Sequence, residues 1–412
     1  DISGWNTSKV TTMHSMFKDA AVFDQNINYA DCGEHPKKWD VSSVLTMKST
    51  FEGASEFNGN ITDWEVLNVT TMDSMFEDAA SFNQNIHSWT VSGVTTMKEM
   101  FKDAIVFNQD ISGWNTSNVT TLESMFYGAY VFNQNISDWN TSSGVTMETM
   151  FYGASGFNNG GAILDWSNTA AVTTMSGMFM HAITFNQDIS GWNVSTVETM
   201  SSMFYGASGF NNNNIALGWS DTSSVVTMDS MFKNAIAFNV DNTDWDTTAV
   251  TTMANMFNGA TIFNQDISAW DVSGVITMES MFEKADAFNQ DINAWNTDKV
   301  ANFKHMFKDN GIYNNGYTSG CSGRQPIDWN TSSGTTMEGM FYGAPVFDQD
   351  ITTWDVSSVT NMTNMFRDAV IFDQNIRVWD VENAVTVTDM FTNATALDAR
   401  YDASHGVDDE DD

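Results

Sequence analysis

The 412-residue sequence has few cations, few cysteines and no long apolar run. Lys and Arg together number 16 against 52 Asp and Glu, which gives a formal net charge of -36. This charge opposes binding to nucleic acid or to anionic membranes, because both require cations that neutralise phosphates or headgroups. No stretch of eighteen apolar residues occurs, so no segment is expected to insert into a membrane. We therefore predict a soluble acidic surface with no nucleic-acid partner.

The sequence also lacks the short motifs of catalytic and cofactor sites. The six histidines are scattered, and no zinc spacing such as His-Glu-x-x-His is present. No phosphate-binding loop, nucleophile elbow or dinucleotide fingerprint occurs either. We predict that the protein is not an enzyme and that it has no cofactor, with calcium as the one exception considered below.

What the sequence does contain is a regular series of tryptophans. Twelve of the fourteen gaps between successive tryptophans measure 25 to 27 residues, and the other two measure 34. A fixed period in this range indicates a repeat architecture, which presents surfaces made of rows rather than one converging pocket. The fifteen members are Trp5, Trp39, Trp64, Trp89, Trp114, Trp139, Trp166, Trp192, Trp219, Trp245, Trp270, Trp295, Trp329, Trp354 and Trp379.

Each repeat unit contains two local patterns. Ile111, Trp114 and Thr116 match the Leu-x-x-Leu-x-Leu strand of a leucine-rich repeat. Apolar residues at i, i+3, i+4 and i+7 within 122–129 then indicate one face of a short helical turn, which Gly128 can end. We therefore predict an α/β repeat solenoid of about 15 coils. Each coil is expected to be right-handed and leucine-rich-repeat-like, with a parallel β ladder and short helical turns.

Equivalent positions of the repeat form columns with distinct expected roles. The Met and aromatic columns account for the large aromatics as core, which leaves no cofactor-binding cluster. An Asn or Asp follows the later aromatic of each unit, and we predict that these side chains satisfy backbone groups at a corner. This column includes Asn83, Asn108, Asn133, Asn264 and Asp348.

The residue after Trp is acidic or amidic in most units and is expected to face outward. Such a column could collect Ca²⁺, which takes six to eight oxygen ligands, although the Gly-Gly-x-Gly-x-Asp calcium repeat is absent. The weak metal candidates are Asp40, Asp246, Asp271, Asp355 and Asp380.

The repeat resembles a known surface-protein repeat. The segments Trp270-Asp-Val-Ser-Gly-Val-Ile-Thr-Met-Glu-Ser-Met-Phe282 and Phe263-Asn-Gln-Asp-Ile-Ser268 look like the roughly 26-residue unit of the BspA-like leucine-rich-repeat family. The resemblance covers residues 1 to about 398. It implies a secreted or surface-anchored protein of bacteria or some microbial eukaryotes, often linked to adhesion. The family offers no catalytic residues to transfer.

Two 34-residue units interrupt the regular period, and each contains one of the two cysteines, Cys32 and Cys321. The surrounding sequence also returns at an offset of 290, for example Trp5-Asn-Thr-Ser-Lys-Val as Trp295-Asn-Thr-Asp-Lys-Val. We predict a single solenoid over 1–398, with an eleven-coil super-repeat over 1–290 and a partial second copy from 291. An acidic tail follows over 399–412. Chance similarity between units is the alternative.

Eleven coils would separate the two cysteines by roughly 50 Å, far beyond the reach of one disulfide. Cys32 and Cys321 are therefore either inert thiols or inter-chain disulfide candidates that would link chains into a polymer.

Glycosylation sequons are frequent, and several are simply repeat positions. Whether they carry glycan depends on the host. The candidates are Asn6, Asn60, Asn68, Asn115, Asn118, Asn135, Asn140, Asn193, Asn330, Asn361 and Asn393.

Three functions are compatible with this sequence. We predict a non-catalytic, secreted or cell-surface protein that acts in adhesion or as a structural subunit of an extracellular filament or coat, with chain–chain contacts at the two cysteine-containing inserts. Its partners would be further copies of itself or other cell-surface or matrix proteins or glycans. One alternative is a ligand-binding adhesin that stays monomeric. A remote alternative is an ice-binding protein, suggested by the threonine column at Thr71, Thr96, Thr121 and Thr252.

Overall fold

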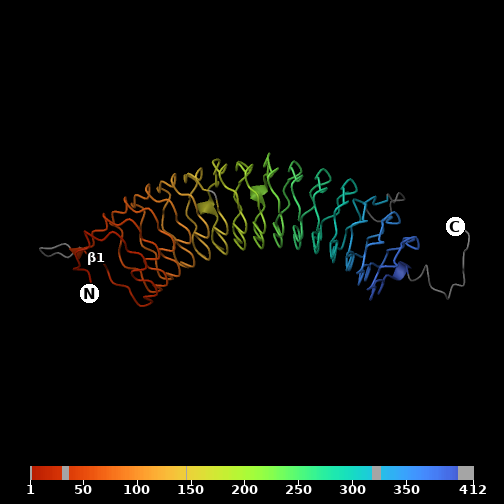
Figure 1. Cartoon of the computed structure of the whole chain (residues 1–412), viewed down its shortest axis with the longest axis horizontal. Coiled ribbons are helices and arrows are strands. Elements are labelled where there is room, and N and C mark those ends of the chain that lie inside the picture. Colours follow the sequence, from red (N-terminus) through yellow and green to blue (C-terminus); the bar gives the residue numbers. More distant parts are fainter. Residues whose placement is uncertain (1, 30–36, 145, 318–325, 398–412) are drawn as a thin grey trace, which may run out of the picture. The chain divides into compact units, whose positions relative to one another are not determined.

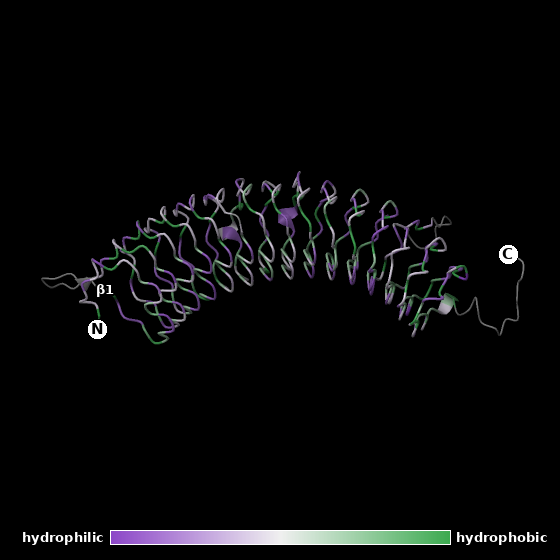
Figure 2. Cartoon of the chain, viewed as in Figure 1, coloured by the Kyte–Doolittle hydropathy of each residue, from purple (hydrophilic) through white to green (hydrophobic). Residues whose placement is uncertain are grey.

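The chain forms two compact units, Asp1–Val225 (unit 1) and Val226–Asp412 (unit 2). The computed structural model describes residues 2–29, 37–144, 146–317 and 326–397. Each unit consists of successive coils that lie side by side, where one coil is the stretch from one tryptophan to the next (Figure 1). Apolar and polar residues are mixed within each coil rather than gathered in one part of the chain (Figure 2).

Regular secondary structure is sparse in the described residues. Strands β1 (Asn28–Tyr29) and β2 (Lys37–Lys38) form an antiparallel pair in unit 1. Two short 3₁₀ helices, η1 (Asn159–Gly161) and η2 (Asn212–Asn214), also lie in unit 1. Residues 395–397 are helical in unit 2.

The predicted α/β class, with its parallel β ladder, is wrong. Neighbouring coils are joined at the threonine column only by isolated parallel bridges, such as Thr46↔Thr71 and Thr71↔Thr96. Each bridge stops after a single residue because the chain passes directly from Thr71 into a series of turns at residues 73–78. No continuous parallel sheet therefore forms among the described residues.

The predicted short helix is also wrong, and residues 122–129 show why. Ser124 and Gly128 have left-handed φ values of 53° and 64°, whereas an α-helix requires right-handed φ throughout. The Met125 N–H donates to the carbonyl three residues back at 3.1 Å, as in a β-turn. Consecutive turns place apolar residues at nearly the same intervals as a helix does. The spacing alone could not distinguish the two.

Alternate backbone N–H groups of these turns donate to carbonyls of the next coil instead of to carbonyls of their own coil. The N–H groups of Ser124 and Gly128 donate to the carbonyls of Glu148 and Tyr152, at 2.9 and 2.7 Å. The same pattern recurs in unit 2, where the Gly259 N–H donates to the Glu283 carbonyl at 2.8 Å. Hydrogen bonds between coils therefore replace the bonds that a helix would make within itself.

The prediction that the aromatic columns form the core is confirmed. Phe101 is fully buried and stacks on Phe107 of its own coil at 4.0 Å between ring centroids and on Phe126 of the next coil at 5.7 Å. Trp114 stacks on Trp139 at 6.4 Å with nearly parallel planes. Offset stacking of this kind adds to the hydrophobic gain of burial. The continuous aromatic core holds the coils of a unit together.

The predicted role of the Asn column is also confirmed. Asn83 Oδ1 accepts hydrogen bonds from the backbone N–H of Asn108 at 3.0 Å and from Gln109 Nε2 at 2.9 Å. In unit 2 the carboxylate of Asp348 plays the same part, accepting from the Asp373 N–H at 3.0 Å. These side chains satisfy backbone donors at a corner that lack a partner in regular secondary structure.

The two long coils carry their inserts at different points. In the first, Ile27 fills the buried Ile column and the insert follows it, entering the β1–β2 hairpin. In the second, the insert precedes Ile327, which fills the same column and is 1% exposed. Cys32, Cys321 and the tail 399–412 lie outside the described residues. The super-repeat and the disulfide candidates therefore stay predictions.

Candidate binding surface

An exposed apolar ridge spans two adjacent coils of unit 1. It consists of two outward positions between the buried Ala and later Phe columns, and its members are Ile105, Val106, Tyr130 and Val131. The exposed fractions of these four residues range from 38% to 52%. Val22 and Ile183 are exposed at the same positions of coils that do not adjoin these two. Contiguous apolar exposure on a soluble surface marks interaction sites more often than isolated exposed residues do.

The turn between Ala104 and Phe107 explains why these side chains are exposed. The Phe107 N–H donates to the Ala104 carbonyl at 3.1 Å, so the chain reverses between two fully buried columns. Ile105 and Val106 occupy the two central positions of that turn. The repeat fixes the turn but leaves the identity of its central residues free.

The coil that follows Tyr130 carries small residues at this corner. The Gly156 N–H donates to the Tyr130 carbonyl at 2.8 Å, and a Cβ on Gly156 would lie only 2.6 Å from that oxygen. The Glu56 and Ser81 N–H groups make the equivalent bond at 2.9 and 3.0 Å, so the bond itself does not require glycine. Gly156 leaves Tyr130 and Val131 without a large side chain at the equivalent position of the next coil.

Tyrosines lie three residues before the ridge position in three coils of unit 1, at Tyr127, Tyr152 and Tyr205. Tyr127 stacks on Tyr152 with 4.3 Å between ring centroids, and His181 contacts Tyr152 edge-on at 5.8 Å. Tyr205 continues the row, at 5.1 Å from the ring of His181. Burial and the neighbouring Tyr152 raise the pKa of Tyr127, so its hydroxyl stays protonated at neutral pH.

Charged groups flank this tyrosine row. Lys102 Nζ lies 2.7 Å from Glu77 Oε1 and 6.0 Å from the centroid of Tyr127. The hydrogen bond that Lys102 donates to Glu77 raises the pKa of Lys102. Burial, and then the like charges of other carboxylates, raise the pKa values of Asp78 and Asp103. Burial is thus the main reason that the neutral forms of these two carboxyl groups are favoured.

Unit 2 has an equivalent tyrosine, but cations cover it. Lys308 Nζ lies 5.9 Å and Arg367 Cζ 5.6 Å from the ring centroid of Tyr342. Lys308 also pairs with Glu283 at 3.0 Å. In unit 2 the side chains of Lys308 and Arg367 therefore lie on the Tyr342 ring, whereas in unit 1 Tyr127 stacks on a second tyrosine.

The five calcium candidates are used in local turns. Asp246 Oδ1 accepts from the backbone N–H of Thr248 at 3.0 Å and from its hydroxyl at 2.6 Å. These bonds lower the pKa of Asp246. Bonds to the backbone N–H two residues on, at 2.8 to 3.1 Å, likewise engage Asp40, Asp271, Asp355 and Asp380.

No group of three or more His, Cys, Asp or Glu side chains that could hold a metal occurs in the part of the chain that the structure describes. The structure does not bring the five candidates together, and calcium binding stays a prediction.

The sequons lie along the outer surface of the coils. Their side chains bind within the protein in two ways. The Oδ1 atom accepts a backbone N–H two residues on in Asn6, Asn60, Asn115, Asn135, Asn140, Asn193 and Asn330. The Nδ2 atom donates to a neighbouring coil in Asn68, Asn118, Asn330, Asn361 and Asn393. Their glycosylation stays a prediction.

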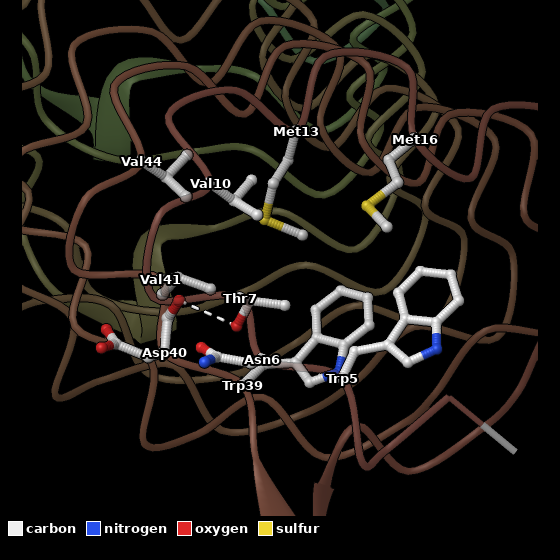
Figure 3. Close-up of a pocket in the computed structure, with 10 residues that line it drawn as sticks. All are labelled: Trp5, Asn6, Thr7, Val10, Met13, Met16, Trp39, Asp40, Val41 and Val44. Atoms are coloured by element: carbon white, nitrogen blue, oxygen red, sulfur yellow. Dashed lines mark hydrogen bonds between the residues drawn. The ribbon is translucent and has the colours of Figure 1, made fainter.

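A hollow of about 330 Å³ lies at the first coil of unit 1. Figure 3 shows the residues that line it. Trp5, which is 54% exposed, lies beside Trp39 with 6.0 Å between ring centroids. The rest of the lining consists mainly of column side chains such as Val10, Met13 and Met16. The carboxylate of Asp40 is already bound to Ser42, so the hollow offers no free ionisable group and we assign it no ligand.

Sequence reasoning missed the ridge, although a signal was present. Most coils carry a small or polar residue at one or both of its positions, as in Ser155-Gly156 and Ser208-Gly209. Ile105-Val106, Tyr130-Val131 and Val370-Ile371 instead carry a large apolar residue at both positions. Within residues 2–29, 37–144, 146–317 and 326–397, no helix has the length and apolar character needed to span a bilayer.

Comparison with known proteins identifies one family. A family model described as "Mycoplasma protein of unknown function, DUF285" matches residues 1–34, 28–137, 90–167, 131–239, 212–320 and 317–405. No curated protein matches the chain.

Two solved structures show weak likeness. TLR13, in a complex with ssRNA13, is 11% identical with a TM-score of 0.25, over 87% of this chain and 61% of that one. The functional domain of InlJ from Listeria monocytogenes is 8% identical with a TM-score of 0.16, over 64% of this chain and 58% of that one. This chain thus spans less than two thirds of either, and neither likeness carries an argument about fold or function.

Proposed function

Because this chain belongs to the DUF285 repeat family, whose units cover residues 1–405, we propose that it is a non-catalytic repeat protein that binds macromolecules at a cell surface or outside the cell. Adhesion is the form of this function that we favour. The observation that carries the proposal is the exposed apolar ridge of unit 1, which packing does not require.

Two further features support a binding role. The pairs Ile105-Val106 and Tyr130-Val131 lie on adjacent coils, as do the stacked rings of Tyr127 and Tyr152, so they offer a flat surface suited to a polymer or protein rather than a small molecule. Tyrosine is also enriched at protein interfaces, because one side chain supplies both apolar area and a hydroxyl.

An adhesion assay tests this function. Beads coated with the full chain are expected to adhere to matrix-coated or cell-coated surfaces, and Ile105→Ser/Val106→Ser should remove most of that adhesion. The matched control is Val370→Ser/Ile371→Ser in unit 2, because these two residues have the same exposed fractions, 38% and 39%. Equal adhesion by all three proteins would refute the proposal.

The polymer alternative has its own test. If Cys32 and Cys321 link chains, non-reducing gels should show multimers that a reductant dissolves. A monomer in both conditions would remove the disulfide-linked filament from consideration. No contact among the described residues favours this alternative, so adhesion remains the primary proposal.

Ice binding is not favoured. The threonine column suggested for it is half-buried, and its hydroxyls bind within the protein. Thr121 Oγ1 accepts the Glu123 N–H at 3.2 Å, and Thr252 Oγ1 accepts the Ala254 N–H at 3.3 Å. These hydroxyls are half-buried and each already accepts one hydrogen bond, so a thermal-hysteresis assay is expected to show no effect.

A further inference from the structure

Two tyrosines of unit 1 lie face to face on adjacent coils. The rings of Tyr127 and Tyr152 stack with 4.3 Å between their centroids and an interplanar angle of 3°. Phe126 and Phe151, which precede them in the sequence, stack between the same two coils at the wider distance of 5.6 Å. The two phenol rings are therefore the closer of the two aromatic pairs at this place.

Backbone hydrogen bonds hold these two tyrosines in register. The Gly128 N–H donates to the Tyr152 carbonyl at 2.7 Å, and the Phe126 N–H donates to the Met150 carbonyl at 2.9 Å. The residues on both sides of Tyr127 are thus tied to the coil that carries Tyr152. Because the two backbones are fixed, the two phenol rings stay adjacent without a diffusional search.

The two rings nevertheless have room to move. Both tyrosines are half-buried, and each is followed by a glycine, Gly128 or Gly153. A Cβ at Gly153 would meet no atom nearer than 4.0 Å, so the surface beside the rings is open there. Stacked rings can therefore tilt toward each other by a small rotation about their side-chain bonds.

No further aromatic ring of the described residues stacks on the outer faces of this pair. Lys102 of the preceding coil lies 6.0 Å from the Tyr127 centroid, and His181 of the following coil meets Tyr152 edge-on at 5.8 Å. In the part of the chain that the structure describes, each tyrosine therefore has the other as its one stacked partner. A reaction between stacked phenols at this place would involve these two residues alone.

Tyrosines of unit 2 have different neighbours. Lys308 and Arg367 lie 5.9 and 5.6 Å from the ring centroid of Tyr342. Tyr313 is fully buried and stacks on Phe307 at 3.7 Å, and phenylalanine has no hydroxyl group. Neither tyrosine has a phenol stacked on it, so unit 2 offers no equivalent pair among its described residues.

Adjacent phenols are the substrates of oxidative coupling. A haem peroxidase with H₂O₂ is a one-electron oxidant, and it takes one electron and the hydroxyl proton from each phenol to leave two phenoxyl radicals. The radicals join through a carbon–carbon bond between positions ortho to the oxygens. The two displaced ring hydrogens restore the hydroxyl groups as the rings regain aromaticity. Two tyrosines and one H₂O₂ thus give one dityrosine and two H₂O, and the chain loses two hydrogen atoms.

From this geometry we propose that Tyr127 and Tyr152 form a dityrosine cross-link when a peroxidase-type oxidant acts on the chain. The bond joins two adjacent coils of unit 1 and closes a loop between residues that are 25 positions apart in the sequence. A covalent loop restricts the unfolded chain, so the bond stabilises unit 1. This inference goes beyond the proposed binding function, because the cross-link requires neither the ridge nor a partner.

Oxidation of the full chain by a haem peroxidase and H₂O₂ tests the proposal. We expect the blue fluorescence of dityrosine, a chain that stays monomeric on a denaturing gel, and a mass lower by two hydrogen atoms. Digestion at Asp138 and Glu148, which separate the two tyrosines in the sequence, should yield a peptide pair joined between Tyr127 and Tyr152. Because coupling occurs within one chain, its fractional yield should be unchanged on dilution of about tenfold. Absence of dityrosine, bonds at other tyrosines instead, or a yield that falls on dilution would overturn the proposal.

Two matched phenylalanine variants locate the bond. Tyr152→Phe keeps the stacked ring but removes the phenol, so it should lower the dityrosine fluorescence about tenfold or more. Tyr342→Phe removes a tyrosine whose ring is flanked by cations and should change the fluorescence by less than about twofold. Equal losses in the two variants, or an unchanged signal in Tyr152→Phe, would refute the assigned pair. Thermal unfolding without oxidant confirms that each variant is folded.

The stabilising effect of the bond has its own measurement. The oxidised full chain should melt about 5 °C or more above the untreated chain, as followed by tryptophan fluorescence. Oxidised Tyr152→Phe should melt no higher than its untreated form, which controls for oxidation at other side chains. A bond between Tyr127 and Tyr152 that leaves the melting temperature unchanged would remove the stabilising role.

Adhesion by the same samples keeps this inference separate from the proposed function. We expect oxidised and untreated chains to adhere equally, because the cross-link leaves the ridge in place. Loss of adhesion in Ile105→Ser/Val106→Ser with normal dityrosine formation supports both proposals. Normal dityrosine formation by a chain that never adheres would refute only the binding function, and adhesion without dityrosine would refute only the cross-link.

Discussion

Buried and exposed apolar residues alternate within a few positions of one coil. Phe101 and Phe107 are fully buried and stacked, whereas Ile105 and Val106 between them are 38% and 39% exposed. The buried pair recurs in almost every coil, but the exposed pair becomes Ser155-Gly156 two coils later. The repeat therefore fixes what the coils need for stacking, and function is expected at positions that stacking leaves free.

The largest effect that this comparison predicts comes from two aromatic residues four positions apart. Phe126→Ala removes a fully buried ring that stacks on Phe101 and Phe132, and it should lower the free energy of unfolding by about 3–5 kcal/mol. Tyr130→Ala removes a ring that is 52% exposed and should change it by less than about 0.5 kcal/mol. Urea unfolding followed by tryptophan fluorescence measures both. Losses of similar size would mean that Tyr130 belongs to the core.

Two glycines at equivalent positions of neighbouring coils provide a second comparison, which concerns the backbone. Gly128 and Gly153 have φ values of 64° and 66°, so alanine is strained at either. A Cβ at Gly128 would also overlap the carboxylate of Asp103, whereas at Gly153 the nearest atoms are 4.0 Å away. We expect Gly153→Ala to cost about 1 kcal/mol and Gly128→Ala about 1–2 kcal/mol more.

Removing the obstructing side chain provides the control for this pair. Asp103→Ala combined with Gly128→Ala should bring the cost back near that of Gly153→Ala, because only the left-handed strain then remains. A double variant no more stable than Gly128→Ala alone would show that the overlap with Asp103 is not the cause.

The contrast between buried positions that stacking requires and exposed positions that it does not require also explains what could be predicted from sequence. The period, the buried columns and the Asn83-type ladder follow from residue type and spacing, and the structure confirms the last two. The helix over 122–129 was wrong because consecutive turns share its apolar spacing. Gly128 aligns with Asp103 and His181, and this mixture of Gly and polar residues is a sign of left-handed φ. The ridge was missed because the exposure of its side chains depends on the neighbouring coils, which the sequence of one repeat does not describe.

Asn242 is an exception within the interior and gives a third prediction. It is 2% exposed in a column filled by Ile267 and Ile292, and its carboxamide O and N have no partner among the described residues. An unpaired buried amide costs about 1–3 kcal/mol. Asn242→Ile should therefore raise the free energy of unfolding by about 1–2 kcal/mol, measured by urea unfolding.

A different buried asparagine supplies the control. Asn310 is fully buried, but its Oδ1 accepts the N–H groups of Ile312 and Tyr313, at 3.2 and 3.0 Å. Asn310→Ala should therefore destabilise, although most coils have alanine there. Stabilisation by Asn310→Ala, or destabilisation by Asn242→Ile, would contradict this account of the two side chains.

The smallest expected effect concerns Asp103, which lies between the interior and the ridge. Burial and the nearby Asp78 raise its pKa above the ordinary 3.8, so folding favours the protonated form. The contribution of this group to stability is therefore fully present below the unfolded pKa and is lost as pH rises through the higher folded pKa. Asp103→Asn should stabilise the chain at pH 7 by less than about 1 kcal/mol after solvent screening, and by nothing well below the unfolded pKa.

Asp246 should show the opposite dependence. Hydrogen bonds from Thr248 lower its pKa, so its contribution is present above the unfolded pKa and is lost as pH falls through the folded value. Asp246→Asn should therefore slightly destabilise at pH 7 and approach neutrality in acid. Measuring the melting temperature of both variants from pH 7 down to strong acid compares the two. If both variants shift the melting temperature in the same direction at pH 7, net charge rather than local environment governs these carboxylates.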